Sequence, residues 1–316
     1  MEEKNNEDLN PSQKEPPIVT TNMPDVVSTY NSNTNRNQMI NGRRYVNVEN
    51  EDYVLPNNKQ ELNSISLQHS LLKYAWCNNF SSPIHEALKT GGLKVLDVGC
   101  GPGTWLFDMC IDYPLCNFVG LDISLVPSST SDVNNITFIQ SNVLDGLPFK
   151  DNTFDFVHQR SWMSSLSMKQ WEPLIRELKR VCKVGGWLEL LETDMVYYNE
   201  GINTRNLRAS RLAFFYSKDF FIDVCNHIPQ FLESVDSFNE INKEECIIPI
   251  GDWAGKIGEL CIKTIYEEYK VIYPELKTIM EVNEEEFDEI LNRFVKEANE
   301  NKTYYKTFRF FCRKFM

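Results

Sequence analysis

Residues 95 to 103 read Val95-Leu96-Asp97-Val98-Gly99-Cys100-Gly101-Pro102-Gly103. The apolar start of this stretch predicts a short buried strand, and its glycines predict a tight turn that leads into a helix capped by Thr104. Glycine lets the backbone approach a ligand closely, and the first turn of a helix presents unpaired amide N–H donors. This order of strand, glycine turn and helix is typical of nucleotide-binding α/β folds, although the same glycines could serve only to build a tight corner.

Short apolar runs and helical patterns alternate around this stretch. Strands are predicted over residues 94–98, 117–122, 136–140, 154–158 and 187–192, with helices over 104–112 and 169–181 between them. Such alternation is typical of a parallel sheet that is covered by helices on both faces. Further helices are predicted over 205–226, 252–269 and 284–300, and further strands over 245–250 and 303–313. The sequence therefore predicts an α/β domain over residues 91–316, with a helical insertion at about 252–300.

The first 90 residues have a different texture. Residues 1–40 are rich in Asn, Ser, Thr and Pro and have few large apolar side chains, so they predict a disordered tail. Residues 41–90 predict an N-terminal helical lid, because Leu62, Ile65 and Leu72 recur at the spacing of an amphipathic helix. The start of the chain is polar, and no charge-free apolar run is long enough to cross a bilayer. We therefore expect no membrane span and a location in the cytoplasm or the nucleus.

The composition limits the possible classes of function. With 316 residues, of which 42% are apolar, the chain can bury one large core, with or without a small lid domain. Its nine cysteines lack the paired spacing of zinc or redox motifs, so we expect reduced thiols and no metal site. A net charge of −13 disfavours binding to phosphate backbones, which depends on clustered Lys and Arg, so no nucleic-acid partner is expected.

Two carboxylates bear on the choice of ligand. Asp122 ends the second predicted strand, 19 residues after Gly103 (122 − 103), where doubly wound folds hold the two hydroxyls of an unphosphorylated ribose. This spacing fits NAD and S-adenosylmethionine alike. Asp97, however, lies two residues before Gly99, and a carboxylate there repels a pyrophosphate but attracts the ammonium of a methionine tail and a sulfonium. The charge pattern therefore favours S-adenosylmethionine over the cofactor of a nicotinamide-dependent oxidoreductase.

The glycine stretch resembles the first motif of the class I S-adenosylmethionine-dependent methyltransferases. The resemblance continues in chain order through a ribose-binding second strand, an adenine-binding third loop and a fourth strand, which are Gly120-Leu121-Asp122-Ile123-Ser124, Gln140-Ser141-Asn142-Val143-Leu144-Asp145-Gly146-Leu147-Pro148-Phe149 and Phe154-Asp155-Phe156-Val157-His158. Val184-Gly185-Gly186-Trp187 is similar to the turn before strand five, with Val184 where the family has proline. The glycines of that turn are also explained by a plain C-cap of the preceding helix, so we predict no contact between this turn and a ligand.

This resemblance implies a Rossmann-like sheet of seven mostly parallel strands with an antiparallel last strand, helices on both faces, and S-adenosylmethionine as the cofactor, which leaves as S-adenosylhomocysteine. The implied cofactor-binding residues lie at the strand ends and in the third loop: Asp97, Gly99, Cys100, Gly101, Gly103, Asp122, Ile123, Asn142, Val143, His158 and Gln159. Many relatives have Asp in place of Asn142. The carbonyl of an Asn can still accept from the adenine amino group if its amide is oriented for it.

A narrower resemblance covers about residues 42–316. Five short motifs resemble those of the fungal LaeA-like methyltransferases: Tyr53-Val54-Leu55-Pro56, Leu67-Gln68-His69, Phe156-Val157-His158-Gln159-Arg160, Ile248-Pro249-Ile250-Gly251-Asp252-Trp253 and Phe311-Cys312-Arg313-Lys314. That group includes nuclear regulators of secondary metabolism as well as many uncharacterised enzymes. Membership therefore does not fix a substrate.

Methyl transfer from a sulfonium is a single displacement, so alignment can supply most of the rate and a base is optional. His158 is the predicted base, because it ends the fourth strand at the edge where ligands of open α/β sheets bind. Alternatively, it is hydrogen-bonded beneath the cofactor. The residues predicted to line the acceptor pocket or its lid are Tyr53, His69, Arg160, Trp162, Glu192 and Tyr197. A structural role remains open for them, such as a surface ion pair for Arg160 or core packing for Trp162.

Two motifs that the sequence lacks narrow the acceptor. No Asn/Asp-Pro-Pro-aromatic tetrapeptide follows the fourth strand, and no Pro-Cys pair occurs for methylation of a base carbon. A small molecule or a protein side chain remains. The cofactor motifs, the acidic composition and the aromatic residues near the expected pocket favour a small-molecule acceptor that is methylated on oxygen or nitrogen. The alternative is a LaeA-like nuclear regulatory protein that acts in a complex with a protein partner and methylates protein, itself included.

Overall fold

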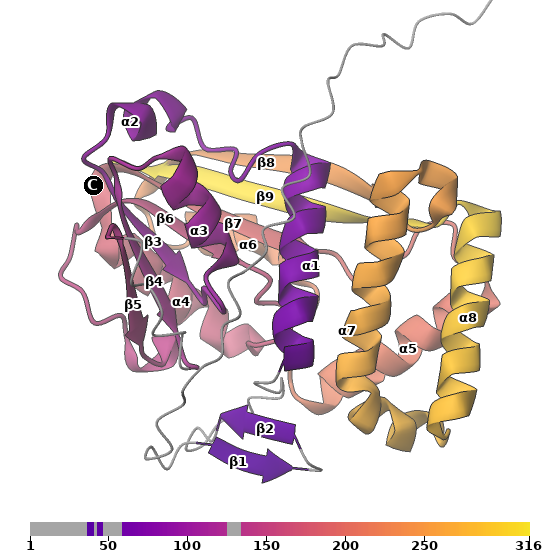
Figure 1. Ribbon diagram of the computed structural model, residues 1–316. Coiled ribbons are helices and arrows are strands. Elements are labelled where there is room, and N and C mark those ends of the chain that lie inside the picture. The colour runs from indigo at the N-terminus through magenta and orange to yellow at the C-terminus, as the bar shows by residue number, and fades with distance from the viewer. Residues whose placement is uncertain (1–36, 41–42, 47–58, 125–133) are drawn as a thin grey trace, which may run out of the picture.

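The protein is described by a computed structural model over residues 37–40, 43–46, 59–124 and 134–316 (Figure 1). Tyr53 and most of the predicted tail lie outside these residues. β1 (Asn37–Ile40) and β2 (Arg43–Val46) form an antiparallel pair in which Asn37 faces Val46. β1 covers the last four residues of the predicted tail. The sequence between the two strands is Asn-Gly, the dipeptide that most favours a hairpin turn.

A seven-stranded sheet forms the centre of the fold, in the order β5-β4-β3-β6-β7-β9-β8. Its strands are β3 (Lys94–Val98), β4 (Asn117–Asp122), β5 (Ile136–Gln140), β6 (Phe154–Arg160), β7 (Cys182–Thr193), β8 (Phe238–Pro249) and β9 (Tyr304–Lys314). The strands from β3 to β7 pair in parallel, whereas β9 runs antiparallel to both of its neighbours, β7 and β8. The predicted Rossmann-like sheet with an antiparallel last strand is confirmed.

The helices are α1 (Lys59–Trp76), α2 (His85–Thr90), α3 (Thr104–Asp112), α4 (Met168–Val181), α5 (Ile202–Ser217), α6 (Val224–Glu233), α7 (Lys256–Met280) and α8 (Glu284–Asn301), with short 3-10 turns η1 (Val143–Asp145) and η2 (Asp252–Ala254). The single helix predicted over 205–226 was wrong. The chain turns between α5 and α6, where Asp219 has a left-handed φ of 58° and the N–H of Phe220 donates back to Phe215. The predicted insertion corresponds to α7 and α8, between β8 and β9.

Two apolar cores cover the two faces of the sheet. Along β3, Val95 belongs to the core that contains Trp105 of α3, whereas Leu96 belongs to the core that contains Leu174 of α4. Successive side chains of a strand point to opposite faces. Asp97 and its register partner on β6, His158, therefore point toward α3.

Four helices gather at one side of the sheet. α1 packs against α7, and α5 packs against α7 and α8 (Figure 1). The predicted N-terminal lid helix therefore lies beside the insertion, and Gln68 and Glu268, 200 residues apart in sequence, are in contact. Within the described ranges, no helix has the length and apolar character needed to cross a membrane, and no group of His, Cys, Asp and Glu side chains is arranged to hold a metal ion.

A buried carboxylate in β7 fastens the segment after α1 to the sheet. Glu189 accepts hydrogen bonds from the N–H groups of Ser81 (2.9 Å) and Ser82 (2.8 Å) and lies 3.5 Å from Nε of Arg309. We expect Glu189→Gln to lower the free energy of unfolding by about 3 kcal/mol, because a buried guanidinium loses its counter-charge. Urea unfolding measures this. Glu233→Gln, exposed at the end of α6, should change it by less than about 0.5 kcal/mol, and equal stability of the two variants would contradict the role of Glu189.

Candidate cofactor and acceptor site

The loop after β3 adopts a backbone conformation that favours glycine at three positions. Gly99, Gly101 and Gly103 have φ values of 69°, 52° and 80°. A Cβ atom on Gly99 would lie 2.4 Å from Nε1 of Trp162, so the indole packs directly against the bare backbone there. A Cβ atom on Gly101 would lie 3.8 Å from Ile65, so α1 covers the loop. The loop thus lies between α1 and the turn after β6 that carries Trp162, with backbone open to a ligand.

Asp122 closes β4 beside this loop. Its carboxylate accepts from the N–H of Gly101 and from the N–H and hydroxyl of Ser124, each at 2.8 Å. Burial raises the pKa of Asp122 above its ordinary value. A carboxylate offers about four acceptor positions, so these three donors leave room for a ribose hydroxyl, and rotation of the Ser124 hydroxyl makes room for a second.

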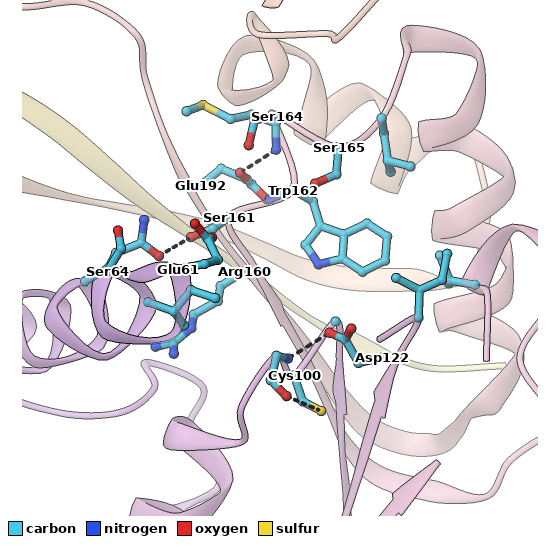
Figure 2. Close-up of a pocket in the computed structure, with 18 of the residues that line it drawn as sticks. Glu61, Ser64, Cys100, Asp122, Arg160, Ser161, Trp162, Ser164, Ser165 and Glu192 are labelled. Carbon is cyan, nitrogen blue, oxygen red and sulfur yellow. Dashed lines mark hydrogen bonds between the residues drawn. The ribbon is translucent and has the colours of Figure 1, made fainter. Parts of the chain in front are cut away.

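A cavity of about 240 Å³ begins at this carboxylate and continues between β6 and the helices (Figure 2). The predicted cofactor residues that line it are Gly99, Cys100, Gly101, Asp122, Ile123, Asn142 and Val143. The predicted acceptor residues that line it are Arg160, Trp162 and Glu192. The predicted residues Asp97, Gly103, His158, Gln159, His69 and Tyr197 do not line it, and Tyr53 lies outside the described residues.

Asn142 lines the cavity at the turn after β5. Its side-chain carbonyl accepts from the N–H of Leu144 at 3.0 Å and so caps η1. This hydrogen bond fixes the turn after β5 that brings Val143 to the cavity wall. The residue therefore orders the loop through its carbonyl, which is the group that the sequence assigned to adenine.

His158 lies beneath the glycine loop and away from the cavity. It is 1% exposed, its Nδ1 is 2.8 Å from Oδ1 of Asp97, and its ring stacks on Trp105 at 3.9 Å between centroids. This placement fits the alternative in which the histidine is hydrogen-bonded beneath the cofactor, and it offers no contact with an acceptor. The same hydrogen bond holds the Asp97 carboxylate on the α3 face of the sheet. The negative charge of Asp97 therefore lies beneath the glycine loop, and it acts on a ligand in the cavity without touching it.

Arg160 is the last residue of β6 and lines the cavity, and residues of α1 and α3 hold its guanidinium. Its guanidinium donates to Nδ1 of His69 (2.9 Å) and to the hydroxyl of Thr104 (3.3 Å). Burial lowers the pKa of His69 to about 4, so its imidazole is neutral near pH 7. Since Nδ1 accepts, the N–H lies on Nε2, which donates to Asp108 at 2.9 Å. His69, predicted as a lid residue, therefore positions Arg160 and fastens α1 to α3 without touching the cavity.

Glu192 lies near the end of β7 and holds the turn that follows β6. Its carboxylate accepts from Nε2 of Gln159 and from the N–H of Trp162, both at 2.8 Å, and from the N–H of Met163 at 3.2 Å. Burial raises the pKa of Glu192 to about 7. Gln159 does not line the cavity, so its effect on a ligand there passes through its hydrogen bond to Glu192. Tyr197, predicted alongside Glu192, packs behind the wall in the apolar core that contains α8.

The wall opposite β6 comes from α1, the predicted lid helix, and from α5 and α7, which the sequence did not assign to the site. The lining residues are Glu61, Ser64, Ile65 and Gln68 from α1, Arg211 and Phe215 from α5, and Glu268, Val271 and Ile272 from α7. Their spacing of three and four residues along α1 and α7 is the available signal, since it places polar side chains on a helix face that also carries apolar ones. That spacing predicts that the residues of one helix share a face, but it does not predict which other helix packs against that face.

Comparison with known proteins identifies a family model and several relatives that match parts of this chain. Residues 95–186 match the family model described as a methyltransferase domain. The secondary metabolism regulator laeA of Coprinopsis cinerea is 26% identical over 225 residues, which cover 66% of this chain and 56% of that protein. The methyltransferase pytC of Aspergillus terreus is 28% identical over 242 residues, covering 72% and 69%. The N-methyltransferase verN of Clonostachys rogersoniana is 29% identical over 144 residues, covering 44% and 50%.

This chain therefore spans between half and about two thirds of the length of these relatives. The segment that matches the family model contains the glycine loop, Asp122 and Asn142, which line one cavity. The cofactor is S-adenosylmethionine. Residues 95–186 form a class I S-adenosylmethionine-dependent methyltransferase domain, and the chain that contains it is LaeA-like.

Proposed function

We propose that this chain transfers a methyl group from S-adenosylmethionine to an oxygen or nitrogen atom of a small-molecule acceptor. The supporting observation is the continuity of the cavity, which passes from Asp122 to a partly apolar compartment formed by Phe215, Val271 and Ile272. A partly apolar compartment in the same cavity as the proposed cofactor site suits a metabolite. The names of two relatives, a methyltransferase and an N-methyltransferase, support the same class of reaction.

The lining residues fit the chemical parts of the cofactor. Asp122 would accept from the ribose hydroxyls, and the apolar side chains of Ile123 and Val143 suit the faces of an adenine ring. Arg160 and Glu61 carry opposite charges at the end covered by α1, where they suit the carboxylate and ammonium of the amino-acid tail.

The residues of this chain contribute to the reaction mainly by positioning the cofactor and the acceptor. When bound, the cofactor supplies a methyl group on a sulfonium, which is a good leaving group. α1 covers the glycine loop through Ile65, and Glu192 fixes the backbone of Trp162 and Met163 at the wall. A fixed wall that aligns the acceptor atom with the methyl carbon can supply several kcal/mol of the rate enhancement.

We expect incubation with labelled S-adenosylmethionine and a fungal metabolite extract to place label in a small-molecule fraction, because the proposed cofactor site and acceptor site belong to one cavity. Liquid chromatography of the deproteinised extract measures this. Gly101→Arg, which blocks the cofactor site, is the control and should transfer no label. If no component of the extract gains label with the wild-type protein, the proposed acceptor class is wrong.

A second candidate is a nuclear regulatory protein that methylates protein, itself included, whereas we expect the metabolite enzyme in the cytoplasm. The observation that favours it is Met163, which lines the cavity and offers a nucleophilic thioether although it is 7% exposed. The relative from Coprinopsis cinerea is named as a regulator. In the same incubation, label on the protein that Met163→Leu removes would favour this candidate over the first.

A further inference from the structure

Glu192 is a buried carboxylate at the acceptor end of the cavity. It is 0% exposed in the folded chain, yet it lines the cavity (Figure 2). Its Oε1 accepts two hydrogen bonds at 2.8 Å, whereas its Oε2 accepts one at 3.2 Å. Among the described residues, its contacts are N–H donors without a Lys, Arg or His within ion-pair distance. Oε2 therefore keeps acceptor capacity for a ligand.

The guanidiniums that line the same cavity have their hydrogen-bond and ion-pair partners away from Glu192. Arg160 is held by α1 and α3, as described above. Arg211 lies 3.2 Å from Glu268, and its guanidinium sits over the ring of Phe215 at 5.4 Å. No described side chain of the wall therefore balances the charge of Glu192.

A buried carboxylate without a counter-charge takes up either a proton or a cationic ligand. Burial raises the pKa of Glu192 to about 7, although the surrounding N–H donors oppose this. Near neutral pH the group is therefore present in both forms, as a general base must be.

We propose that the acceptor is an amine that enters the cavity as an ammonium, binds to Glu192 and gives it a proton before methylation. This inference rests on the proposed function. One N–H proton passes to Oε2, and the freed nitrogen lone pair forms the N–C bond as the C–S bond of the sulfonium breaks. The products are an N-methylated ammonium and a neutral thioether, and Glu192 then loses its proton to solvent. Phe215, Val271 and Ile272 receive the apolar part of the amine.

The test compares benzylamine with its neutral isostere, benzyl alcohol, as ligands of the complex with S-adenosylhomocysteine, by calorimetry at pH 8. We expect benzylamine to bind Glu192→Gln at least tenfold more weakly than wild type, and benzyl alcohol to bind both alike. Acidification below pH 7 should weaken benzylamine binding to wild type only, because Glu192 takes up a proton there. The affinity for S-adenosylhomocysteine should change far less than that for benzylamine, since glutamine keeps the acceptor oxygen for Gln159 and Trp162 and loses only the weaker hydrogen bond from Met163. Glu233→Gln, exposed on α6, is the matched control and should behave as wild type.

Equal affinity of benzylamine for wild type and Glu192→Gln would overturn the inference, as would absence of benzylamine binding or tighter binding of benzyl alcohol. Turnover separates this inference from the proposed function. If benzylamine binding needs Glu192 but no N-methylbenzylamine forms with S-adenosylmethionine, the amine site stands and the proposed reaction fails. If the product forms, Glu192→Gln should be at least 100-fold slower, and its rate should no longer fall tenfold per pH unit below pH 7.

Discussion

Gly101→Arg is expected to abolish binding of S-adenosylhomocysteine while the protein stays folded. The loop at Gly101 faces Ile65 of α1 across a gap in which a Cβ atom makes ordinary contact at 3.8 Å, so the first side-chain atom fits. The remaining atoms of an arginine extend into the cavity that Gly101 lines. Calorimetric titration should show no heat with the variant. With wild type it should show heat with S-adenosylmethionine or S-adenosylhomocysteine and none with NAD.

Gly92→Arg is a matched control for the backbone strain that an arginine causes at a left-handed position. Gly92 also has a left-handed φ, of 80°, but lies before β3, at the end opposite the loop, and a Cβ atom there would meet nothing within 4 Å. Both substitutions carry a strain of roughly 1–2 kcal/mol. Gly92→Arg should therefore show a similar loss of stability with unchanged binding. If both variants bind as wild type does, the assignment of the glycine loop is wrong.

Three strands at one side of the sheet, β3, β4 and the edge strand β5, could be predicted residue by residue. The predicted bounds 94–98, 117–122 and 136–140 are those of β3, β4 and β5, because these short apolar runs end abruptly at glycine, proline or polar residues. The break between α5 and α6 was not predictable from periodicity, since Phe214, Phe215 and Phe220 all belong to one core and conceal the turn at Asp219.

The position of His158 shows what register adds to a sequence pattern. The sequence places this histidine at the end of a strand, but not on a particular face. In the sheet, His158 is the register partner of Asp97, so the two side chains share the α3 face and pair with each other. A shift of one residue would have turned the imidazole to the opposite face.

The acceptor wall depends on contacts that a local pattern cannot contain. Gln68 on α1 donates to Glu268 on α7 at 3.2 Å, across 200 residues of sequence. Glu268 in turn pairs with Arg211 on α5. Amphipathic spacing predicts that each helix is half buried, but the pairing of three helices follows from the tertiary fold. The cofactor end could therefore be predicted from contiguous motifs, and most of the acceptor end could not.

Asp122→Ala is expected to weaken binding of S-adenosylhomocysteine by roughly 100-fold or more. Each hydrogen bond from a ribose hydroxyl to a carboxylate contributes about 1.5–3 kcal/mol, so loss of two corresponds to about 3 kcal/mol or more. The substitution also removes the acceptor for the N–H of Gly101 and so loosens the glycine loop. Because burial raises the pKa of Asp122, the affinity of wild type should fall on acidification at a higher pH than an exposed aspartate would allow.

Asp112→Ala and Asp122→Asn distinguish the carboxylate from its neighbours. Asp112 is exposed at the end of α3, so its removal should leave binding unchanged. An asparagine at position 122 keeps one acceptor oxygen but turns an amide N–H2 toward either Gly101 or Ser124, both of which donate to the carboxylate. Its affinity should therefore fall nearly as far as that of the alanine variant. Wild-type affinity in Asp122→Asn would mean that the ribose is held elsewhere, because a charge and two acceptor oxygens are what this position offers that an amide does not.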